Sequence, residues 1–448
     1  MKKLLYLPIE IKHRELLAKI LVAFFAAKKN FYSIIGDKES IERSIRYFGE
    51  GIYFDKSISL NKTNKLKKLK DKNIKVVCQD EEGGFNKIFK KHISTFFNKR
   101  IPPENLNLIE QFYCWGSFDY NELKKRNKKN LNKIFETGSP RIDLWKKKFI
   151  SKIFHNEIKM IKKTYGDFLL FPTSFGITSL EEKKKRIKQA KFLNYIKSKS
   201  EIKFQKIEYD NLYSNFLEFV ALIKYLSKKF PKQKIIIRPH FAENKSDWEK
   251  KFKNYRNVEI NNDYDISLWI LAAKIILHNG STTGIQSYAM NKPVIIYSTK
   301  NSDLRQNTYP NKYGIEIKNK KRIYDYLKIS NFKLVRKKID RINISKNFIS
   351  NEIVRNFNRI KVKKNNKYKS YIPFLLNFFY IIRKFRISKA PKSLTKTYIR
   401  NYNEKMPGGL TKAEIQEFIN RLELYFKVQK SIKVRYCGPN CFLIYKIK

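Results

Sequence analysis

The sequence predicts an α/β protein made of two doubly wound, Rossmann-like parallel-sheet domains. Short apolar runs alternate with helix-length segments along roughly the first 330 residues. The apolar runs are continuous rather than alternating, which is typical of strands covered on both faces and therefore of parallel sheets. The chain of 448 residues is longer than one ordinary domain, and its apolar fraction of 42% is ample for packed cores.

The first predicted domain covers residues 1–150, and we assign it to the acceptor. A segment with helical apolar spacing, residues 15–28, lies between its first two strands. Residues 137–143 should open a basic helix that runs to about Lys163 and crosses to the second domain. The expected strands are 4–9, 32–35, 52–54, 74–78, 112–115 and 134–136.

The second predicted domain covers residues 151–330, and we assign it to the nucleotide donor. One of its helices, 266–273, should be capped by Asp263 or Asp265. Two such domains in tandem, facing each other across a cleft, describe the GT-B architecture. The expected strands are 168–171, 235–237, 258–260, 275–277 and 294–297, and the other helices are 209–230 and one beginning near Ser246.

A basic, aromatic and mostly helical tail is predicted for residues 331–448. Residues 371–386 are aromatic and amphipathic and end in basic residues, which suits a helix lying in a membrane interface. The alternative is a helix that packs back across the two domains. A capping box from Thr411 to Glu414 predicts a final helix that ends near Tyr425.

The amino-acid composition limits which binding partners and which cellular compartment we expect for this protein. The formal net charge is +57, but the lysines are scattered and no nucleic-acid-binding motif accompanies them, so we expect no nucleic-acid partner. An anionic inner-membrane surface remains a plausible partner. The apolar start is broken by Pro8, Glu10 and Lys12, which favours a core strand over a signal peptide. Four dispersed cysteines indicate a reducing compartment, hence a cytoplasmic protein, with peripheral membrane binding as an option.

A turn of small hydroxylated residues follows the strand 275–277. Free backbone N–H groups and the dipole of the next helix favour a phosphate there. We therefore assign Ser281, Thr282, Thr283 and Gly284 to phosphate binding, and Gln286 to a base or ribose contact. The alternative is that the hydroxyl groups only cap the helix.

Two further strand ends carry candidate ligand-binding residues. In an open α/β sheet, ligands bind outside the carboxyl ends of the strands. Arg238 and His240 follow one strand, and a guanidinium and an imidazole there could hold a nucleotide's phosphates or neutralise a leaving phosphate. Thr173, Ser174 and Gly176 follow another strand and could close over a diphosphate. The alternatives are a helix cap at His240 and a plain turn at 173–176.

Three carboxylates follow the fourth strand of the first domain: Asp80, Glu81 and Glu82. They could act as a general base for an acceptor hydroxyl, as a nucleophile or as a metal ligand. The alternative is a solvated acidic loop. Glu10, after the first strand, is a second and weaker candidate. We expect no metal site and no cofactor beyond a nucleotide-sugar co-substrate.

These motifs, in this order, resemble the bacterial family usually called surface carbohydrate biosynthesis proteins. The second domain is also similar to the CDP-glycerol glycerophosphotransferases, in which an Arg-x-His-Pro element and a Ser-Ser turn hold the donor's phosphates. It is similar as well to the Kdo transferases of capsule assembly, which use CMP-linked donors. Here Phe241, not proline, follows His240. The matching segments are 6–10, 51–56, 80–83, 137–141, 238–240 and 278–283.

The resemblance implies a GT-B glycosyltransferase that moves a sugar from a nucleotide-activated donor to a surface polysaccharide or lipopolysaccharide. The acceptor is then a glycan or a lipid-linked molecule. The first choice of donor is a CMP-linked ulosonic acid such as Kdo. His240 and an acidic group among Asp80, Glu81 and Glu82 would be catalytic. The alternatives are a CDP-glycerol-type phosphotransferase, a sugar-nucleotide epimerase, and a non-enzymatic basic scaffold that binds anionic lipid or nucleic acid.

Overall fold

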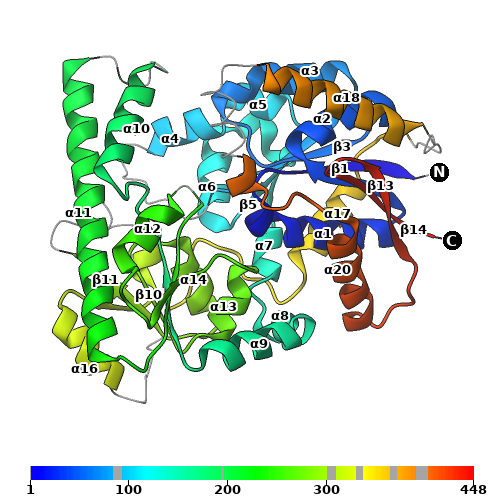
Figure 1. The fold of residues 1–448 in the computed structure, drawn as a ribbon. Coiled ribbons are helices and arrows are strands. Elements are labelled where there is room, and N and C mark those ends of the chain that lie inside the picture. Colours follow the sequence, from blue (N-terminus) through cyan, green and yellow to red (C-terminus); the bar gives the residue numbers. More distant parts are fainter. Residues whose placement is uncertain are drawn as a thin grey trace. The chain divides into compact units, whose positions relative to one another are not determined.

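The chain divides into two compact units, drawn in Figure 1. The first unit comprises Met1–Ile153 together with Asp340–Lys448, and the second comprises Phe154–Ile339. The structure is a computed structural model. The residues that it describes are 2–83, 93–192, 196, 198–241, 243–299, 309–328, 337–363, 371–389 and 402–447.

The first unit is built on an eight-stranded sheet in the order β13-β14-β2-β1-β3-β4-β5-β6. The six strands from the N-terminal part are parallel, and β13 and β14 form an antiparallel hairpin that pairs with β2. Almost every residue of β1 and β2 is buried, as the continuous apolar runs predicted. The bounds are β1 (Lys3–Ile9), β2 (Phe31–Asp37), β3 (Ile52–Asp55), β4 (Lys75–Gln79), β5 (Gln111–Cys114), β6 (Ile134–Glu136), β13 (Ile432–Gly438) and β14 (Cys441–Lys446).

Helices cover both faces of this sheet. In Figure 1, α2, α3 and α18 lie on one face, and α1, α17 and α20 lie on the other. Side chains of α2, α3 and α18 share one apolar core with β1, β2, β3 and β4. The bounds are α1 (Lys12–Lys28), α2 (Lys38–Phe48), α3 (Thr63–Asp71), α4 (Ile93–Arg100), α5 (Pro103–Asn107), α6 (Ser117–Arg126), α7 (Pro140–Asp143), α8 (Lys147–Ile153), α17 (Ile349–Asn358), α18 (Ile372–Ser388) and α20 (Lys412–Tyr425).

The C-terminal segment is part of the first unit, which differs from the separate region predicted for residues 331–448. The buried carboxylate of Asp143 accepts hydrogen bonds from the backbone N–H of Ile349 (3.0 Å) and of Ser350 (2.8 Å), and so caps α17. The predicted capping box of Thr411 and Glu414 opens α20. The hairpin was not predicted, so the tail is less purely helical than expected.

The long basic helix predicted from residue 137 to about Lys163 is instead three short helices: α7, α8 and α9 (His155–Tyr165). The backbone leaves the helical region at Phe154, with φ −118° and ψ 35°. The boundary between the two units falls at this break.

The second unit is built on a parallel six-stranded sheet in the order β12-β11-β10-β7-β8-β9. Asp265 caps α13, as one of the two predicted alternatives stated. The edge strand β12 was not predicted. The strand bounds are β7 (Leu169–Pro172), β8 (Ile235–Arg238), β9 (Val258–Ile260), β10 (Ile275–His278), β11 (Val294–Tyr297) and β12 (Ile315–Ile317). The remaining helices are α10 (Leu180–Phe192), α11 (Lys199–Lys229), α12 (Lys245–Phe252), α13 (Ile266–Ala272), α14 (Thr282–Ala289) and α16 (Lys320–Lys328).

Both sheets reverse their strand order once, as Rossmann-like units do. The tandem of two doubly wound, Rossmann-like parallel-sheet units confirms the predicted α/β fold class. Within the described ranges, no helix combines the length and the apolar character needed to cross a bilayer.

Candidate active site

Strand order identifies the ligand-binding edge of the second unit. Its order reverses between β7 and β10, and ligands of such sheets bind at the carboxyl ends of the strands flanking the reversal. Pro172 pairs with Arg238, and the register of Ile276 with Leu170 brings His278 level with Pro172. The three predicted donor-site segments therefore leave the sheet at one edge.

The turn between β10 and α14 has the predicted form. Gly280 has a φ of +73°, a conformation that favours glycine, and its N–H donates to the side-chain oxygen of Asn311 (2.8 Å). The Ser281 hydroxyl accepts from the backbone N–H of Thr283 (3.4 Å) and caps α14. Thr282 is exposed in the first turn of the helix. The amino end of α14 thus lies at the ligand-binding edge.

Gly284 packs against the ring of His278. A Cβ atom at this glycine would lie 2.1 Å from Nε2 of the ring, so no larger residue fits without a shift. Burial lowers the pKa of His278 to about 3, and within the described residues neither ring nitrogen has a hydrogen-bond partner. His278 is thus a neutral packing residue, and its ring explains why position 284 is a glycine, while the phosphate contact predicted for Gly284 stays a prediction.

Arg238 holds a loop rather than presenting its charge to the edge. Nη1 donates to the backbone oxygens of Asn261 (3.2 Å) and Asp263 (2.7 Å), and Nη2 donates to those of Asn262 (3.2 Å) and Tyr264 (3.0 Å). Burial lowers the pKa of Arg238 to about 10. Because the terminal nitrogens of its guanidinium are engaged by carbonyls, the phosphate contact predicted for Arg238 is corrected to a structural role.

Gln286 also points into the unit. Its side chain is buried, and Nε2 donates to the hydroxyl of Ser267 in the first turn of α13 (2.7 Å). The predicted contact with a base or ribose is therefore corrected to a link between α13 and α14.

Sequence reasoning missed Glu243, which organises the loop after β7. Its buried carboxylate accepts from the hydroxyl of Thr173 (2.5 Å), the indole N–H of Trp248 (3.0 Å) and the backbone N–H of Phe175 and Gly176. Burial raises the pKa of Glu243, although these hydrogen bonds act in the opposite direction. Thr173 and Gly176 therefore shape the loop. A lone glutamate in a loop gave no sequence signal.

His240 and Ser174 are half-buried at the same edge. The backbone N–H of His240 donates to the hydroxyl of Thr173 (3.3 Å), which places the loop after β8 beside the loop after β7. The imidazole ring lies 4.1 Å from the ring of Phe241. The predicted roles of His240, Ser174 and the Ser281–Thr283 turn stay predictions that this geometry permits.

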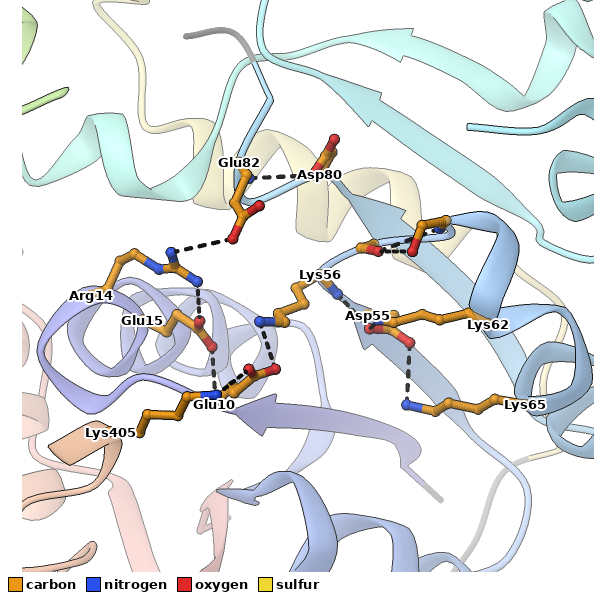
Figure 2. Close-up of polar contacts among 12 residues, drawn as sticks. Glu10, Arg14, Glu15, Asp55, Lys56, Lys62, Lys65, Asp80, Glu82 and Lys405 are labelled. Atoms are coloured by element: carbon orange, nitrogen blue, oxygen red, sulfur yellow. Dashed lines mark hydrogen bonds and ion pairs between the residues drawn. The ribbon is translucent and has the colours of Figure 1, made fainter. Parts of the chain in front are cut away.

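In the first unit, the strand order reverses between β1 and β3, where a network of charges lies (Figure 2). Glu10, after β1, forms ion pairs with Lys56 (2.6 Å) and Lys405 (3.0 Å). Burial alone would raise the pKa of Glu10, but the two lysines outweigh it and hold the pKa at about 2. Glu10 is therefore a permanent anion and is unsuited to the role of general base.

The first turn of α1 continues this network, as Figure 2 shows. Arg14 pairs with Glu15 (3.0 Å) and lies 3.9 Å from Glu82. Glu15 also accepts the backbone N–H of Glu10 (2.9 Å). Positive and negative groups thus alternate along the carboxyl edge of the sheet.

The three predicted catalytic carboxylates have different surroundings. Arg100 donates to both oxygens of Asp80, so Asp80 is a structural ion-pair partner, which corrects its assignment as a general base. Glu82 is exposed between Arg14 and Arg100. Glu81 is buried, lies 3.7 Å from Arg141, and its Oε2 accepts no hydrogen bond from the described residues.

Two titratable groups near these carboxylates were missed. Burial, followed by the charge of Asp80, raises the pKa of Asp119 in the first turn of α6 to about 7. Lys19 of α1 is also buried; it donates to the backbone oxygen of Phe54 (3.3 Å), and burial lowers its pKa. The signal available for Asp119 was its position just after β5. Across the described ranges, no group of three or more His, Cys, Asp or Glu residues is arranged to hold a metal ion.

Comparison with known proteins gives similarity at the level of structure. No family model matches the sequence, and no curated protein matches it. The UDP-GlcNAc 2-epimerase of Methanocaldococcus jannaschii gives a TM-score of 0.46 at 13% identity, covering 80% of this chain and 99% of that one. The structure of S. aureus MnaA with UDP gives a TM-score of 0.48 at 12% identity, covering 82% of this chain and 100% of that one. The wall teichoic acid polymerase TagF gives a TM-score of 0.43 at 13% identity, covering 73% of this chain and 79% of that one. At these scores the similarities decide nothing about activity.

Proposed function

We propose that this protein is a transferase of the GT-B type that uses a nucleotide-activated sugar as its donor. The observation that supports this most directly is the placement of His240 and the Ser281–Thr283 turn at one edge of the second sheet, beside its strand-order reversal. The amino end of α14 would bind the donor's phosphate through backbone N–H groups. The half-buried imidazole of His240 would stabilise the charge that develops on the leaving phosphate.

The first unit supplies the acceptor side in this proposal. Glu81 follows β4 and is buried, and its Oε2 has no hydrogen-bond donor among the described residues. We therefore choose Glu81 as the proton acceptor, because Asp80 is held by Arg100, Glu82 lies between Arg14 and Arg100, and Arg141 is 3.7 Å from Glu81, beyond hydrogen-bond distance. The acceptor would be a surface glycan or a lipid-linked glycan.

Nucleotide binding tests the donor site. We expect one of CMP, CDP, UDP and GDP to raise the melting temperature, since a ligand at 100 times its Kd stabilises the folded state by about 2.7 kcal/mol. Thr282→Glu should abolish the shift, because an acidic side chain in the first turn of α14 repels a phosphate while suiting the helix dipole. The shift is measured by differential scanning fluorimetry.

Asn64→Glu is the matched control, because Asn64 is an exposed residue in the first turn of α3 in the other unit. It should leave the nucleotide shift unchanged. An equal shift in the wild type and in Thr282→Glu would refute the proposed phosphate site. The preferred nucleotide also tests the donor: CMP would support the ulosonic acid prediction, CDP a CDP-alcohol phosphotransferase, and UDP a sugar-nucleotide epimerase.

We also propose that α18 binds the surface of an anionic membrane. One side of this helix packs on the body of the first unit through Ile372 and Leu376, which are buried, and through an ion pair from Arg383 to Glu39. The other side carries an apolar seam at spacings of 4, 3 and 4 residues. Its members are Phe374, Phe378, Ile381 and Phe385, with exposed fractions of 72%, 50%, 64% and 60%.

The surroundings of this seam favour a bilayer over a neutral surface. Lys384 is exposed on the same helix, Lys389 is exposed directly after its last residue, and β13, which packs against α18, exposes Lys433 and Arg435. An apolar seam with a cationic rim is typical of helices that lie in the headgroup region of anionic membranes.

Vesicle binding tests this membrane surface. Phe374→Ser with Phe378→Ser should weaken binding to vesicles of phosphatidylcholine and phosphatidylglycerol by at least about tenfold, because two aromatic side chains no longer enter the bilayer. Phe204→Ser with Ile207→Ser is the control, since these residues of α11 are 66% and 51% exposed in the other unit. Equal binding of the two double variants in co-sedimentation would contradict the proposal.

A further inference from the structure

The second unit has a cavity of about 580 Å³ near the amino ends of its strands, whereas the candidate donor site lies at their carboxyl ends. It lies between the last turns of α11 and α12 and the turn that leads into β9, and these segments approach the amino ends of β8 and β9. This volume is in the range of small-molecule sites. Its lining contains six cations and no carboxylate: Lys224, Lys228, Lys250, Lys251, Lys253 and Arg256.

None of these six cations forms an ion pair in the described part of the chain, where no carboxylate oxygen lies within 4.0 Å of them. Elsewhere in the same unit cations are paired, such as Lys245 with Glu249 (3.4 Å) and Arg186 with Glu182 (2.7 Å). The carboxyl ends of the two helices supply only about −0.5 elementary charge each. The lining itself, with the two helix ends counted, therefore carries a charge of about +5.

The backbone behind the cavity is fixed. Nδ2 of Asn257 donates to the backbone oxygens of Ser227 (3.2 Å), Phe230 (3.0 Å) and Gln233 (3.0 Å), which ties the turn to the end of α11. The ring of Tyr255 packs 5.7 Å from the ring of Phe252 in the core. The lysines are thus mounted on a rigid frame, which lowers the ordering cost of binding a ligand between them.

We propose that this cavity binds a ligand that carries three or more phosphate groups. Gathered lysines repel one another, and a polyanion relieves that repulsion in water without being taken into a low-dielectric interior. Lysine ammonium groups bind phosphate as point charges and need no bidentate geometry. The phosphates could belong to a soluble oligophosphate or to a lipid headgroup, which share this chemistry. The site is separate from the donor edge and does not depend on the proposed transferase activity.

Calorimetric titration of the full-length protein with tripolyphosphate at fixed ionic strength tests the site. Lys228→Glu with Lys251→Glu should weaken binding by at least about tenfold, since two attractive contacts become repulsive. Lys67→Glu with Lys68→Glu, on the exposed side of α3, makes the same change of net charge and should alter the affinity by less than about twofold. Lys228→Gln with Lys251→Gln should give an intermediate loss with an unchanged melting temperature.

A second arm separates the two sources of phosphate. Phosphatidylcholine vesicles containing a phosphatidylinositol bisphosphate, compared with phosphatidylcholine alone, report on a lipid headgroup. If Lys228→Glu with Lys251→Glu loses binding to the phosphatidylinositol bisphosphate vesicles, the phosphates belong to a lipid headgroup. If this variant loses tripolyphosphate binding but binds the vesicles like the wild type, the ligand is a soluble oligophosphate. Equal losses in the cavity and α3 variants would show diffuse charge attraction and overturn the proposal, as would unchanged affinity in both. Nucleotide binding at Thr282 should be unaffected in either case.

Discussion

Replacing His240 by alanine should lower kcat for sugar transfer by about 10²- to 10³-fold, the usual effect of removing one group that stabilises charge in the transition state. His240 is half-buried at the carboxyl end of β8, and the hydrogen bond to the hydroxyl of Thr173 is donated by its backbone N–H and not by its ring. The substitution therefore leaves that hydrogen bond in place, and the melting temperature should change little. Turnover is measured with the nucleotide sugar whose nucleotide gives the largest thermal shift.

His155→Ala is the matched control, since His155 is an exposed histidine in the same unit, at the start of α9. It should retain full turnover. Unchanged turnover in His240→Ala would remove this residue from the mechanism. A large fall in its melting temperature would instead make it a structural residue.

Much of the fold could be predicted because the strands are short, continuous apolar runs whose burial follows from their own sequence. β8 and β10 are entirely buried, and their carboxyl ends are where the candidate residues were predicted. The hairpin of β13 and β14 was missed for a different reason. Ile432 and Val434 of β13 are buried while Lys433 and Arg435 are exposed, but the hairpin joins the sheet through β14, whose partner β2 lies about four hundred residues earlier. A pairing over that distance leaves no local pattern.

The candidate site was predictable in position but less so in chemistry. Strand ends locate residues at the edge of a sheet, yet they do not say which groups already have partners. Asp80, in the loop after β4, is engaged by Arg100 of α4, and Thr173 is engaged by Glu243, seventy residues later. Only the folded chain brings these partners together. The same applies to Asp119, whose raised pKa depends on burial beside Asp80.

For Arg238, the role predicted from the sequence and the role indicated by the structure lead to different experimental results. If it binds phosphate, Arg238→Lys should retain most of the nucleotide affinity, and Arg238→Ala should lose affinity without loss of stability. The four hydrogen bonds to the loop 261–264 predict another result. Both substitutions should destabilise the second unit by about 3 kcal/mol, because four partly buried carbonyls lose their donors and one ammonium cannot replace a planar guanidinium.

For a unit of this size, such a loss corresponds to a fall of about 6–12 °C in melting temperature. Arg322→Lys is the control, because Arg322 is exposed on α16 and should change neither stability nor binding. Nucleotide affinity measured well below the transition should differ by less than about threefold between Arg238→Lys and the wild type, since in both the phosphate contacts come from α14. If Arg238→Ala weakened nucleotide binding at least tenfold with an unchanged melting temperature, the guanidinium would be a ligand group after all. The loop 261–264 would then have to be held by its other contacts, chief among them the hydrogen bond from the indole of Trp269 to the backbone oxygen of Asp263.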